Sequence, residues 1–534
     1  MVGRKLNAAG KTVVAVLVVL IAFIVIGGGY ILLQKTNVIG GDKERSSSVS
    51  EISEKSDAGN KNEGNEPKET SKDENSTSQA DKISITLDEW IGWKSLLDAN
   101  GGLTTAQGSI YDKMGLNVEF IISNDATASS NLLIKGDTQG AGYTVNRYAF
   151  LNQKFKDANV PVKMVYITNF SNGGDGIIAD GNISGVEGLV GKKIAIPEFS
   201  EAQTLVEWLL EASDLTEDQK KSIRSNYILV ETPDDAARVF FSGESNAAAT
   251  WEPYLTQAKE TANAKVLFST KEATNLILDG LVFRQDFLDS HEEEVQKLID
   301  GALQASEMYI TDFDAIRGMP LFTEESEENI IDMASGAKLA TWEQNMSLLT
   351  DEGVTMFADM SSIWLSIGEK ANPNDAETAF NVKYMKALEE KYKDVESEDP
   401  VTFTEEERKV VESKPNTEAL LSKTLTINFG GDSAVIQADS YKALNEFAEI
   451  AKNLNGVYIQ IEGNTADVGG GPDSGKSLSE ERANAIALYL EAQGLNPDRF
   501  IVVGNGASNP VASNDTEEGR IKNRRTDVFF KSGQ

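Results

Sequence analysis

An uncharged apolar run near the start of the chain limits most strongly what this sequence can fold into. Residues 12–34 contain no Asp, Glu, Lys or Arg. As an α-helix, this run would be roughly 34 Å long, which is enough to cross the hydrocarbon core of a bilayer. The run therefore predicts one transmembrane helix close to the N-terminus.

The alternative interpretation of this run is a cleaved signal peptide. Such a peptide has an apolar stretch of about 7–15 residues followed by a cleavage site of small residues. Here the apolar run continues past Gly27–Gly29 through Tyr30–Leu33, and no A-x-A pattern appears. We therefore expect an uncleaved anchor. Basic residues lie on both sides of it, so charge alone sets its orientation only weakly.

Two hydrophilic stretches divide the rest of the chain. Residues 35–82 are mostly Ser, Glu, Lys, Asn, Asp and Gly, with no aromatic residue. Such a composition buries too little apolar surface to offset the entropy of ordering, which predicts a disordered tether. A shorter linker is expected at residues 396–424. The predicted folded domains are then residues 83–395 and 425–534, and residues 1–11 form a short cytoplasmic N-terminus.

Charge and residue content exclude several classes of function. The chain of 534 residues has 84 acidic against 50 basic side chains, a formal net charge of −34. So acidic a surface repels phosphates and argues against nucleic acid as a partner. There is no cysteine and one histidine, His291, which leaves almost no room for thiol, zinc or His-based chemistry. We expect no catalytic residue, no metal and no cofactor.

Strand-like and helix-like segments alternate within residues 83–395. Short apolar runs such as ISITL, VKMVYIT and KKIAIP are separated by longer stretches with helical periodicity, such as SEAQTLVEWLLEAS. Strands that alternate with helices predict an α/β domain with a mainly parallel sheet. More than three hundred residues favour two lobes over one.

An ordered set of segments in this domain resembles a known family. The set is Trp90–Trp93, Tyr111–Leu116, Asp175–Ala179, Gly188–Ala195, Ala247–Tyr254 and Asp279–Arg284. It resembles the periplasmic-type solute-binding proteins of the nitrate, sulfonate and thiamine-precursor ABC transporters. The resemblance implies a hinged cleft that closes on a small polar or anionic solute. It also implies an ABC transporter permease as a partner.

Candidate solute-binding residues follow the strand-like runs, because α/β folds place their ligand loops at the carboxyl ends of strands. The alternative is that the tryptophans pack in the core and the hydroxyls cap helices. The candidates are Trp90, Trp93, Asn169, Ser171, Asp175, Ser200, Thr204, Thr250, Trp251 and Glu252.

The C-terminal region carries three short motifs in a fixed order. GNTAD lies at residues 463–467, LSEERA at residues 478–483 and NRR at residues 523–525. Strand-like and helical segments alternate around them, which predicts a small βαβαβ sandwich. This block, over residues 425–531, resembles the OmpA-like peptidoglycan-binding domain.

The resemblance implies a site for the diaminopimelate of a peptidoglycan stem peptide. Asp467 would hold the ammonium of diaminopimelate, and Arg482 would hold its carboxylate. Asn523 and Arg524 match the closing motif of the family. A zwitterion needs an acceptor-only group beside a rigid bidentate donor, which Asp and Arg provide. The bland alternative is a solvated Asp and Arg on the surface.

The sequence departs from the family pattern at two positions. Ala466 separates Thr465 from Asp467, where the family has Thr directly before Asp. Gly475 stands where the family usually has Asn. These departures put the strength of the stem-peptide contact in question.

One segment of this block also fits the phosphate-binding loop pattern G-x-x-x-x-G-K-S. It runs from Gly470 to Ser477. Pro472 removes a backbone N–H, and Asp473 adds negative charge where such a loop must hold phosphate. We therefore do not expect a nucleotide site.

These features together predict a single-pass membrane protein with its N-terminus in the cytoplasm and its bulk outside, against the cell wall. The leading hypothesis is a wall-attached solute-binding protein. The alternative is a structural membrane-to-wall tether or a sensor, whose two-lobed domain docks a partner protein. A ligand between the lobes would favour the first, and an occluded cleft the second. An enzyme acting on wall fragments is a distant third.

Overall fold

The computed structural model describes residues 81–309, 311–395, 402–430 and 432–533. The predicted anchor lies outside the described residues, as does nearly all of the predicted tether. In the part of the chain that the structure describes, no helix is both long enough and apolar enough to cross a membrane.

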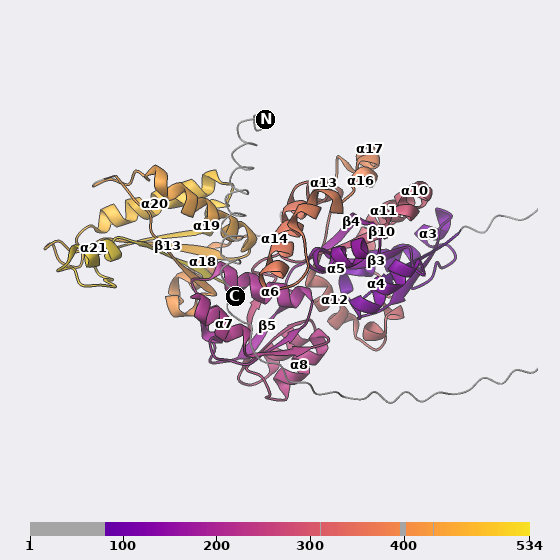
Figure 1. The fold of residues 1–534 in the computed structure, drawn as a ribbon, viewed down its shortest axis with the longest axis horizontal. Helices are drawn as coiled ribbons and strands as arrows, with labels where there is room; N and C mark the ends of the chain where they lie inside the picture. Colours follow the sequence, from indigo (N-terminus) through magenta and orange to yellow (C-terminus); the bar gives the residue numbers. More distant parts are fainter. Residues whose placement is uncertain (1–80, 310, 396–401, 431, 534) are drawn as a thin grey trace, which may run out of the picture. The chain divides into compact units, whose positions relative to one another are not determined.

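The first lobe of the central domain is built on a six-stranded sheet with the strand order β11-β4-β10-β3-β1-β2. Helices cover this sheet, among them α4, α5 and α11 (Figure 1). The strands are β1 (Lys82–Leu87), β2 (Asn117–Ile122), β3 (Gly140–Thr144), β4 (Val162–Ser171), β10 (Leu278–Arg284) and β11 (Ala337–Leu339). The longer helices are α2 (Lys94–Asn100), α4 (Ala126–Lys135), α5 (Val145–Asp157), α11 (Glu292–Ala305), α12 (Glu327–Ser335), α13 (Trp342–Leu348) and α14 (Glu352–Ser366).

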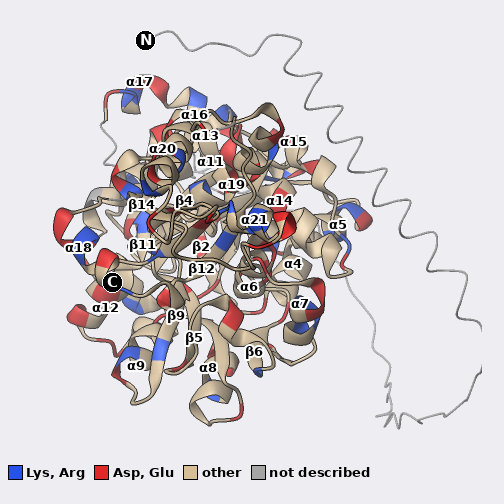
Figure 2. Cartoon of the chain, turned by 90° about the vertical axis from the view of Figure 1, so that its left-hand side faces the viewer, with Lys and Arg blue, Asp and Glu red and all other residues tan. Residues whose placement is uncertain are grey.

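The second lobe is built on a five-stranded sheet with the order β7-β6-β8-β5-β9. Its helices carry many of the acidic side chains drawn red in Figure 2. The strands are β5 (Asp175–Asp180), β6 (Ile194–Pro197), β7 (Tyr227–Val230), β8 (Ala247–Trp251) and β9 (Ala264–Ser269). The helices are α6 (Glu201–Ala212), α7 (Glu217–Arg224), α8 (Pro233–Phe241) and α9 (Tyr254–Glu260).

Both sheets are mixed, so the expectation of a mainly parallel sheet is wrong. Strand β1 runs parallel to β2 and β3, and β6 runs parallel to β7 and β8. Strand β10 is antiparallel to β3 and β4, and β5 is antiparallel to β8 and β9. The chain passes from the first lobe to the second between β4 and β5, and it returns between β9 and β10. The first strand after each passage enters its sheet antiparallel to both of its neighbours.

Two capped helices bring polar side chains to the junction of the lobes. The Thr144 hydroxyl accepts the backbone N–H of Arg147 at 3.0 Å and so begins α5. The Ser200 hydroxyl accepts the N–H of Gln203 at 3.2 Å and begins α6. Each cap satisfies an N–H group that the helix itself leaves without a partner.

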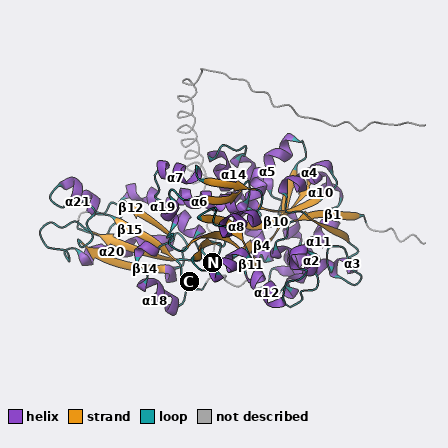
Figure 3. Cartoon of the chain, turned by 90° about the horizontal axis from the view of Figure 1, so that it is seen from below, coloured by secondary structure: helices purple, strands orange, loops and turns teal. Residues whose placement is uncertain are grey.

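The C-terminal domain has four strands in the order β12-β15-β13-β14. Strands β13 and β14 are parallel, and β15 is antiparallel to both β12 and β13. Figure 3 shows these strands with the helices that connect them. The elements are β12 (Leu421–Leu425), α19 (Tyr441–Asn453), β13 (Tyr458–Asn464), α20 (Lys476–Ala492), β14 (Phe500–Gly506), α21 (Glu517–Asn523) and β15 (Thr526–Lys531).

Ordered elements occupy part of the segment predicted as a linker. Helix α18 (Glu405–Ser413) lies within residues 396–424. Strand β12 begins at Leu421, before the predicted domain boundary at residue 425, and pairs with β15 from Leu421 onward. The predicted βαβαβ layout therefore lacked this edge strand, whose short and partly polar sequence LSKTL gave only a weak strand signal.

Candidate functional sites

The two predicted tryptophans are hydrogen-bonded at the carboxyl end of β1. The Trp90 indole N–H donates to Asn169 Oδ1 at 3.0 Å, and the Trp93 indole N–H donates to Asp88 Oδ1 at 2.6 Å. A Cβ added to Gly92 would lie within 2.4 Å of the Asn169 side chain, so glycine permits this close approach. Three predicted residues thus lie together, with Asp88 beside them.

Ser171 and Asp175 lie where the chain passes from the first lobe to the second. The Ser171 hydroxyl donates to Asp175 Oδ2 at 2.6 Å and lies 2.8 Å from the Thr270 hydroxyl. Thr270 lies near the return passage, which follows β9. All three side chains are buried. The two passages between the lobes are therefore joined by a short chain of hydrogen bonds.

The remaining predicted residues make local contacts in the second lobe. Ser200 donates to the Pro197 carbonyl at 2.6 Å, and Thr250 donates to the Pro233 carbonyl at 2.9 Å. Trp251 is buried and pairs with Asp175 across β8 and β5, and the carboxylate of Glu252 accepts from Thr256. Thr204 differs from these, since it accepts from Asn146 of the first lobe at 2.9 Å.

The structure adds four charged residues to those predicted from the sequence. Arg147 of α5 lies with Nη2 at 2.9 and 3.2 Å from the two carboxylate oxygens of Glu201 on α6, so this ion pair joins the two lobes. Asp88 follows β1, and Asp279 lies on β10 opposite Asn169. Asp88 could have been predicted from the sequence, because α/β folds place their ligand loops at the carboxyl ends of strands. Arg147 and Glu201 lie on helices and gave no such signal.

We call Asp88, Arg147, Asp175, Glu201 and Asp279 the junction cluster. Burial raises the pKa of Asp175 to about 7, and the charge of Glu201 raises it further. Burial also raises the pKa of Asp279 well above its usual value, as do the charges of Asp88, Asp175 and Glu201. The pKa of Asp88 is raised by burial against the opposing effect of Arg147. Because the charge of Asp88 raises the pKa of both Asp175 and Asp279, and that of Asp175 raises the pKa of Asp279, the protonation of these three carboxyls is coupled.

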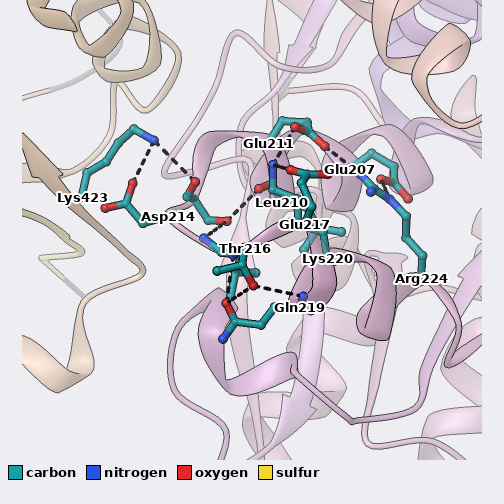
Figure 4. A network of polar contacts seen from close by, with 12 residues as sticks. Glu207, Leu210, Glu211, Asp214, Thr216, Glu217, Gln219, Lys220, Arg224 and Lys423 are labelled. Atoms are coloured by element: carbon teal, nitrogen blue, oxygen red, sulfur yellow. Dashed lines mark hydrogen bonds and ion pairs between the residues drawn. The ribbon is translucent and has the colours of Figure 1, made fainter. Parts of the chain in front are cut away.

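A second charged network, which lies wholly in the second lobe, has more cations for its carboxylates. Glu207 lies 2.8 Å from Arg224, and Glu211 lies 2.8 Å from both Arg224 and Lys220 (Figure 4). Hydrogen bonds from these cations hold the pKa of Glu211 below its ordinary value although burial opposes them. Lys220 also pairs with Glu217 at 3.0 Å. Two cations thus serve three carboxylates there, whereas one guanidinium serves four carboxyls in the junction cluster.

In the C-terminal domain, Asp467 lies in the loop after β13 and is held by that loop. Its Oδ1 accepts the backbone N–H groups of Gly469, Gly470 and Gly471 at 2.8, 2.9 and 3.1 Å. These bonds hold the pKa of Asp467 below its usual value, so the exposed carboxylate is ionised. They also occupy N–H groups of the segment that fits the phosphate-loop pattern.

Arg482 lies on α20 with its guanidinium over the Phe429 ring, 4.9 Å from the ring centre. Its Nε donates to the Ser433 carbonyl at 3.1 Å. Burial lowers its pKa, the charge of Asp432 raises it and that of Arg524 lowers it. Packing on an aromatic face keeps the guanidinium in one orientation.

The two predicted residues of the closing motif have structural contacts. Asn523 Oδ1 accepts the N–H groups of Val511 and Ala512 at 2.8 and 3.0 Å, which fixes the loop before α21. Arg524 forms an ion pair with Glu517 at 2.7 Å. The charge of Arg524 nevertheless lowers the pKa of Arg482, so the two guanidinium groups lie close enough to interact electrostatically.

Gly475 has a conformational reason to replace the Asn of the family pattern. Its φ is 73°, in the left-handed region, and it precedes the first residue of α20. A Cβ at this position would lie 2.7 Å from Thr465 Oγ1. Asn tolerates the left-handed region, but its Cβ would clash with the Thr465 side chain. Glycine at position 475 therefore permits Thr465 to lie where it does.

Comparison with protein families identifies both folded domains. The OmpA family matches residues 428–524, and the NMT1/THI5-like family matches residues 102–315. The peptidoglycan-associated lipoprotein of Pseudomonas putida is 33% identical over 118 residues, which are 22% of this chain and 70% of that protein. The chain belongs to the OmpA family. The match to the NMT1/THI5-like family confirms the second predicted resemblance, so both domains are fused in one polypeptide.

Other relatives match only part of their own length. The peptidoglycan-binding protein ArfA of Mycobacterium tuberculosis is 40% identical over 102 residues, which are 19% of this chain and 31% of ArfA. The chain thus aligns with about a third of that relative.

Two solved structures are similar to the central domain. The alkanesulfonate-binding protein SsuA from Xanthomonas axonopodis pv. citri, bound to MOPS, has a TM-score of 0.44 at 13% identity, covering 56% of this chain and 99% of SsuA. The nitrate-binding protein NrtA from Synechocystis PCC 6803 has a TM-score of 0.45 at 14% identity, covering 58% and 89%.

The raised pKa of Asp175 predicts a pH-dependent stability. Below pH 3.8 its carboxyl is protonated in both the folded and the unfolded chain, so its contribution is fully present. That contribution is lost as the pH rises toward the folded-state pKa of about 7, because only the unfolded chain then releases the proton freely. Between about pH 5 and pH 8, the loss for this group is about 2–3 kcal/mol.

The variant Asp175→Asn should therefore lose less free energy of unfolding than the wild type between these pH values, as measured by urea denaturation. Glu272→Gln is the matched control, since Glu272 also accepts a serine hydroxyl at 2.6 Å and is buried. Identical pH profiles for Asp175→Asn and the wild type would contradict the raised pKa.

Proposed function

We propose that the protein is a membrane-anchored solute-binding protein of the ABC-transporter type that is attached to peptidoglycan through its C-terminal domain. The observation that carries this proposal is the fusion of an NMT1/THI5-like domain with an OmpA-family domain. Residues 12–34 would hold the chain in the membrane and residues 35–82 would span the distance to the folded part. The partners would be peptidoglycan, a small solute and a transporter permease.

The geometry of the C-terminal domain supports the wall contact. Asp467 offers an ionised carboxylate whose Oδ1 is fixed by three backbone N–H groups, which leaves Oδ2 to accept an ammonium. Arg482 offers an oriented guanidinium for a carboxylate. Diaminopimelate carries both groups on one carbon, so a fixed acceptor and a fixed donor suit it. ArfA, which is named as a peptidoglycan-binding protein, shares this domain.

The two-lobed domain supports solute binding through its buried polar junction. Predicted residues Trp90, Asn169, Ser171 and Asp175 all lie there, between β-strands of the two lobes. A buried polar cluster at strand ends is where α/β proteins bind small molecules.

One observation favours the alternative of a rigid tether. Arg147 pairs with Glu201 and Asn146 bonds Thr204, so the two lobes contact each other directly. A domain locked by these contacts would serve as a spacer between membrane and wall, or as a docking module for a partner protein. It would bind peptidoglycan equally well but would gain no stability from any solute.

The wall contact predicts the behaviour of a double variant. Purified full-length protein should co-sediment with diaminopimelate-type peptidoglycan, and Asp467→Ala with Arg482→Ala should weaken this binding. The loss should be at least about a hundredfold, because two charge-assisted contacts of about 1.5–3 kcal/mol each are removed.

The control is Asp498→Ala with Arg520→Ala, which removes the same charges from the same domain. Asp498 is exposed and Arg520 pairs with Glu517. Equal retention of the two double variants would exclude Asp467 and Arg482 from the site.

The anchor predicts that the N-terminus is retained. Mass spectrometry of protein extracted from membranes should detect the peptide that spans residues 1–35, because the apolar run lacks a processing site. Recovery only of a soluble chain that begins within residues 38–50 would contradict the anchor.

A further inference from the structure

The junction cluster has an excess of acceptors over donors, and this excess carries an inference about the solute. The inference rests on the proposed function of the two-lobed domain. Four carboxyls of the cluster come from both lobes: Asp88 and Asp279 belong to the first lobe, and Asp175 and Glu201 to the second. Arg147 is the guanidinium among them, and it is paired with Glu201.

Each of the four carboxyls has a donor within the protein. Asp88 accepts the Trp93 indole N–H, Asp175 accepts the Ser171 hydroxyl, and Glu201 accepts the Arg147 guanidinium. A hydrogen bond from the Trp90 side chain acts on Asp279 and lowers its pKa against the effect of burial. Asp279 Oδ2, however, is buried without a hydrogen-bond partner among the described residues, and the residue is only 4% exposed.

A second acceptor without a donor lies on the neighbouring helix α5. The Nδ2 of Asn146 donates to the Thr204 hydroxyl at 2.9 Å and to the Leu276 carbonyl at 3.1 Å. This fixes the orientation of the amide, and its Oδ1 is left buried without a partner. Within the described part of the chain, Asp279 Oδ2 and Asn146 Oδ1 therefore lack donors, whereas Glu201 Oε2, which also has no hydrogen bond, lies in the ion pair with Arg147.

Such an arrangement is unfavourable. A buried acceptor without a donor has lost its hydrogen bonds to water without replacement, and an ionised one has lost more. The Glu207–Arg224–Glu211–Lys220 network shows that this chain can neutralise partly buried carboxylates with its own cations (Figure 4). The junction cluster has no comparable supply of cations among the residues that act on its pKa values.

We propose that the junction cluster binds a cationic solute whose head group carries several N–H donors, such as a guanidinium, an amidinium or a primary ammonium. Its donors would satisfy Asp279 Oδ2, Asn146 Oδ1 and the remaining lone pairs of Asp88 and Asp175. This cationic class of solute differs from the anionic class that the family resemblance implied.

The proposal implies that binding is linked to proton release. A cation stabilises the ionised form of the neighbouring carboxyls, and burial holds the pKa of Asp175 at about 7 before binding. A cation must therefore displace a proton in weakly acidic solution. Its affinity should rise with pH from about 6 to about 8.

The test measures the melting temperature of the detergent-solubilised full chain with single probe ions at about 10 mM, where binding stabilises the folded state by mass action. The cationic probes are guanidinium, agmatine and ethylammonium, and the anionic probes are nitrate and ethanesulfonate. We expect at least one cation to raise the melting temperature by a few degrees, and more at pH 8 than at pH 6.

The variant Asp279→Asn should lose this rise, and the control Glu272→Gln should keep it. Asp279→Asn should also melt at a higher temperature than the wild type without any probe, because a buried unpaired carboxyl is removed. That second readout shows that the variant folds. A rise with cations that Asp279→Asn retains would overturn the proposed site.

The anionic probes separate failure of this inference from failure of the proposed function. Arg147 Nε is buried without a hydrogen-bond partner, so a true anionic solute would bind there. A rise with nitrate or ethanesulfonate that Arg147→Gln abolishes would overturn the cationic solute but support solute binding. No rise with any of the five probes would overturn the cationic solute and favour the rigid tether.

Discussion

The ion pair between Arg147 and Glu201 is the contact on which the arrangement of the central domain depends. It joins α5 of the first lobe to α6 of the second, and both residues are buried. A buried pair of this kind is stable only while both partners remain, since removing one leaves an uncompensated charge. The pair uses the cation that would otherwise neutralise Asp88, Asp175 or Asp279. The ion pair therefore joins the lobes but, among the described residues, leaves the other three carboxyls without a cation of their own.

The same pair explains why solute binding and rigid closure compete as functions. If Arg147 and Glu201 hold the lobes shut without help, the domain is a spacer. If the remaining carboxyls repel one another strongly enough to oppose closure, a bound cation completes the interface and favours the closed state. When the Arg147–Glu201 pair and the repulsion between the carboxyls nearly balance, a ligand can decide between the open and the closed lobes. It does so by its differential affinity for these two states.

The sequence predicted the domain identities and one residue of the junction cluster, Asp175, and the reasons are specific. Trp90 follows β1, Asn169 lies near the carboxyl end of β4 and Asp175 begins β5. The rule for α/β ligand loops selected all three, and Trp90 and Asn169 are hydrogen-bonded to each other. The rule does not state where a side chain points, so it also selected Thr250, whose hydroxyl donates to a helix-start carbonyl. Arg147 and Glu201 are 54 residues apart on two helices, and no local pattern relates them.

In the C-terminal domain, motif spacing predicted the position of Asp467 but not its contacts. Two of the three glycine N–H groups that hold this carboxylate, those of Gly470 and Gly471, come from the segment that fits the phosphate-loop pattern. The edge strand β12 was missed because its side chains are partly polar, and only pairing with β15 makes it a strand. Both features depend on tertiary contacts, which propensity and periodicity do not contain.

Native mass spectrometry of the full chain, purified from its own host, shows whether the junction of the lobes holds a solute. We expect a bound solute of small-molecule mass on the wild type. We expect bare polypeptide for Asp279→Asn purified in the same way. Bare polypeptide in both samples would contradict a solute site at the junction of the lobes.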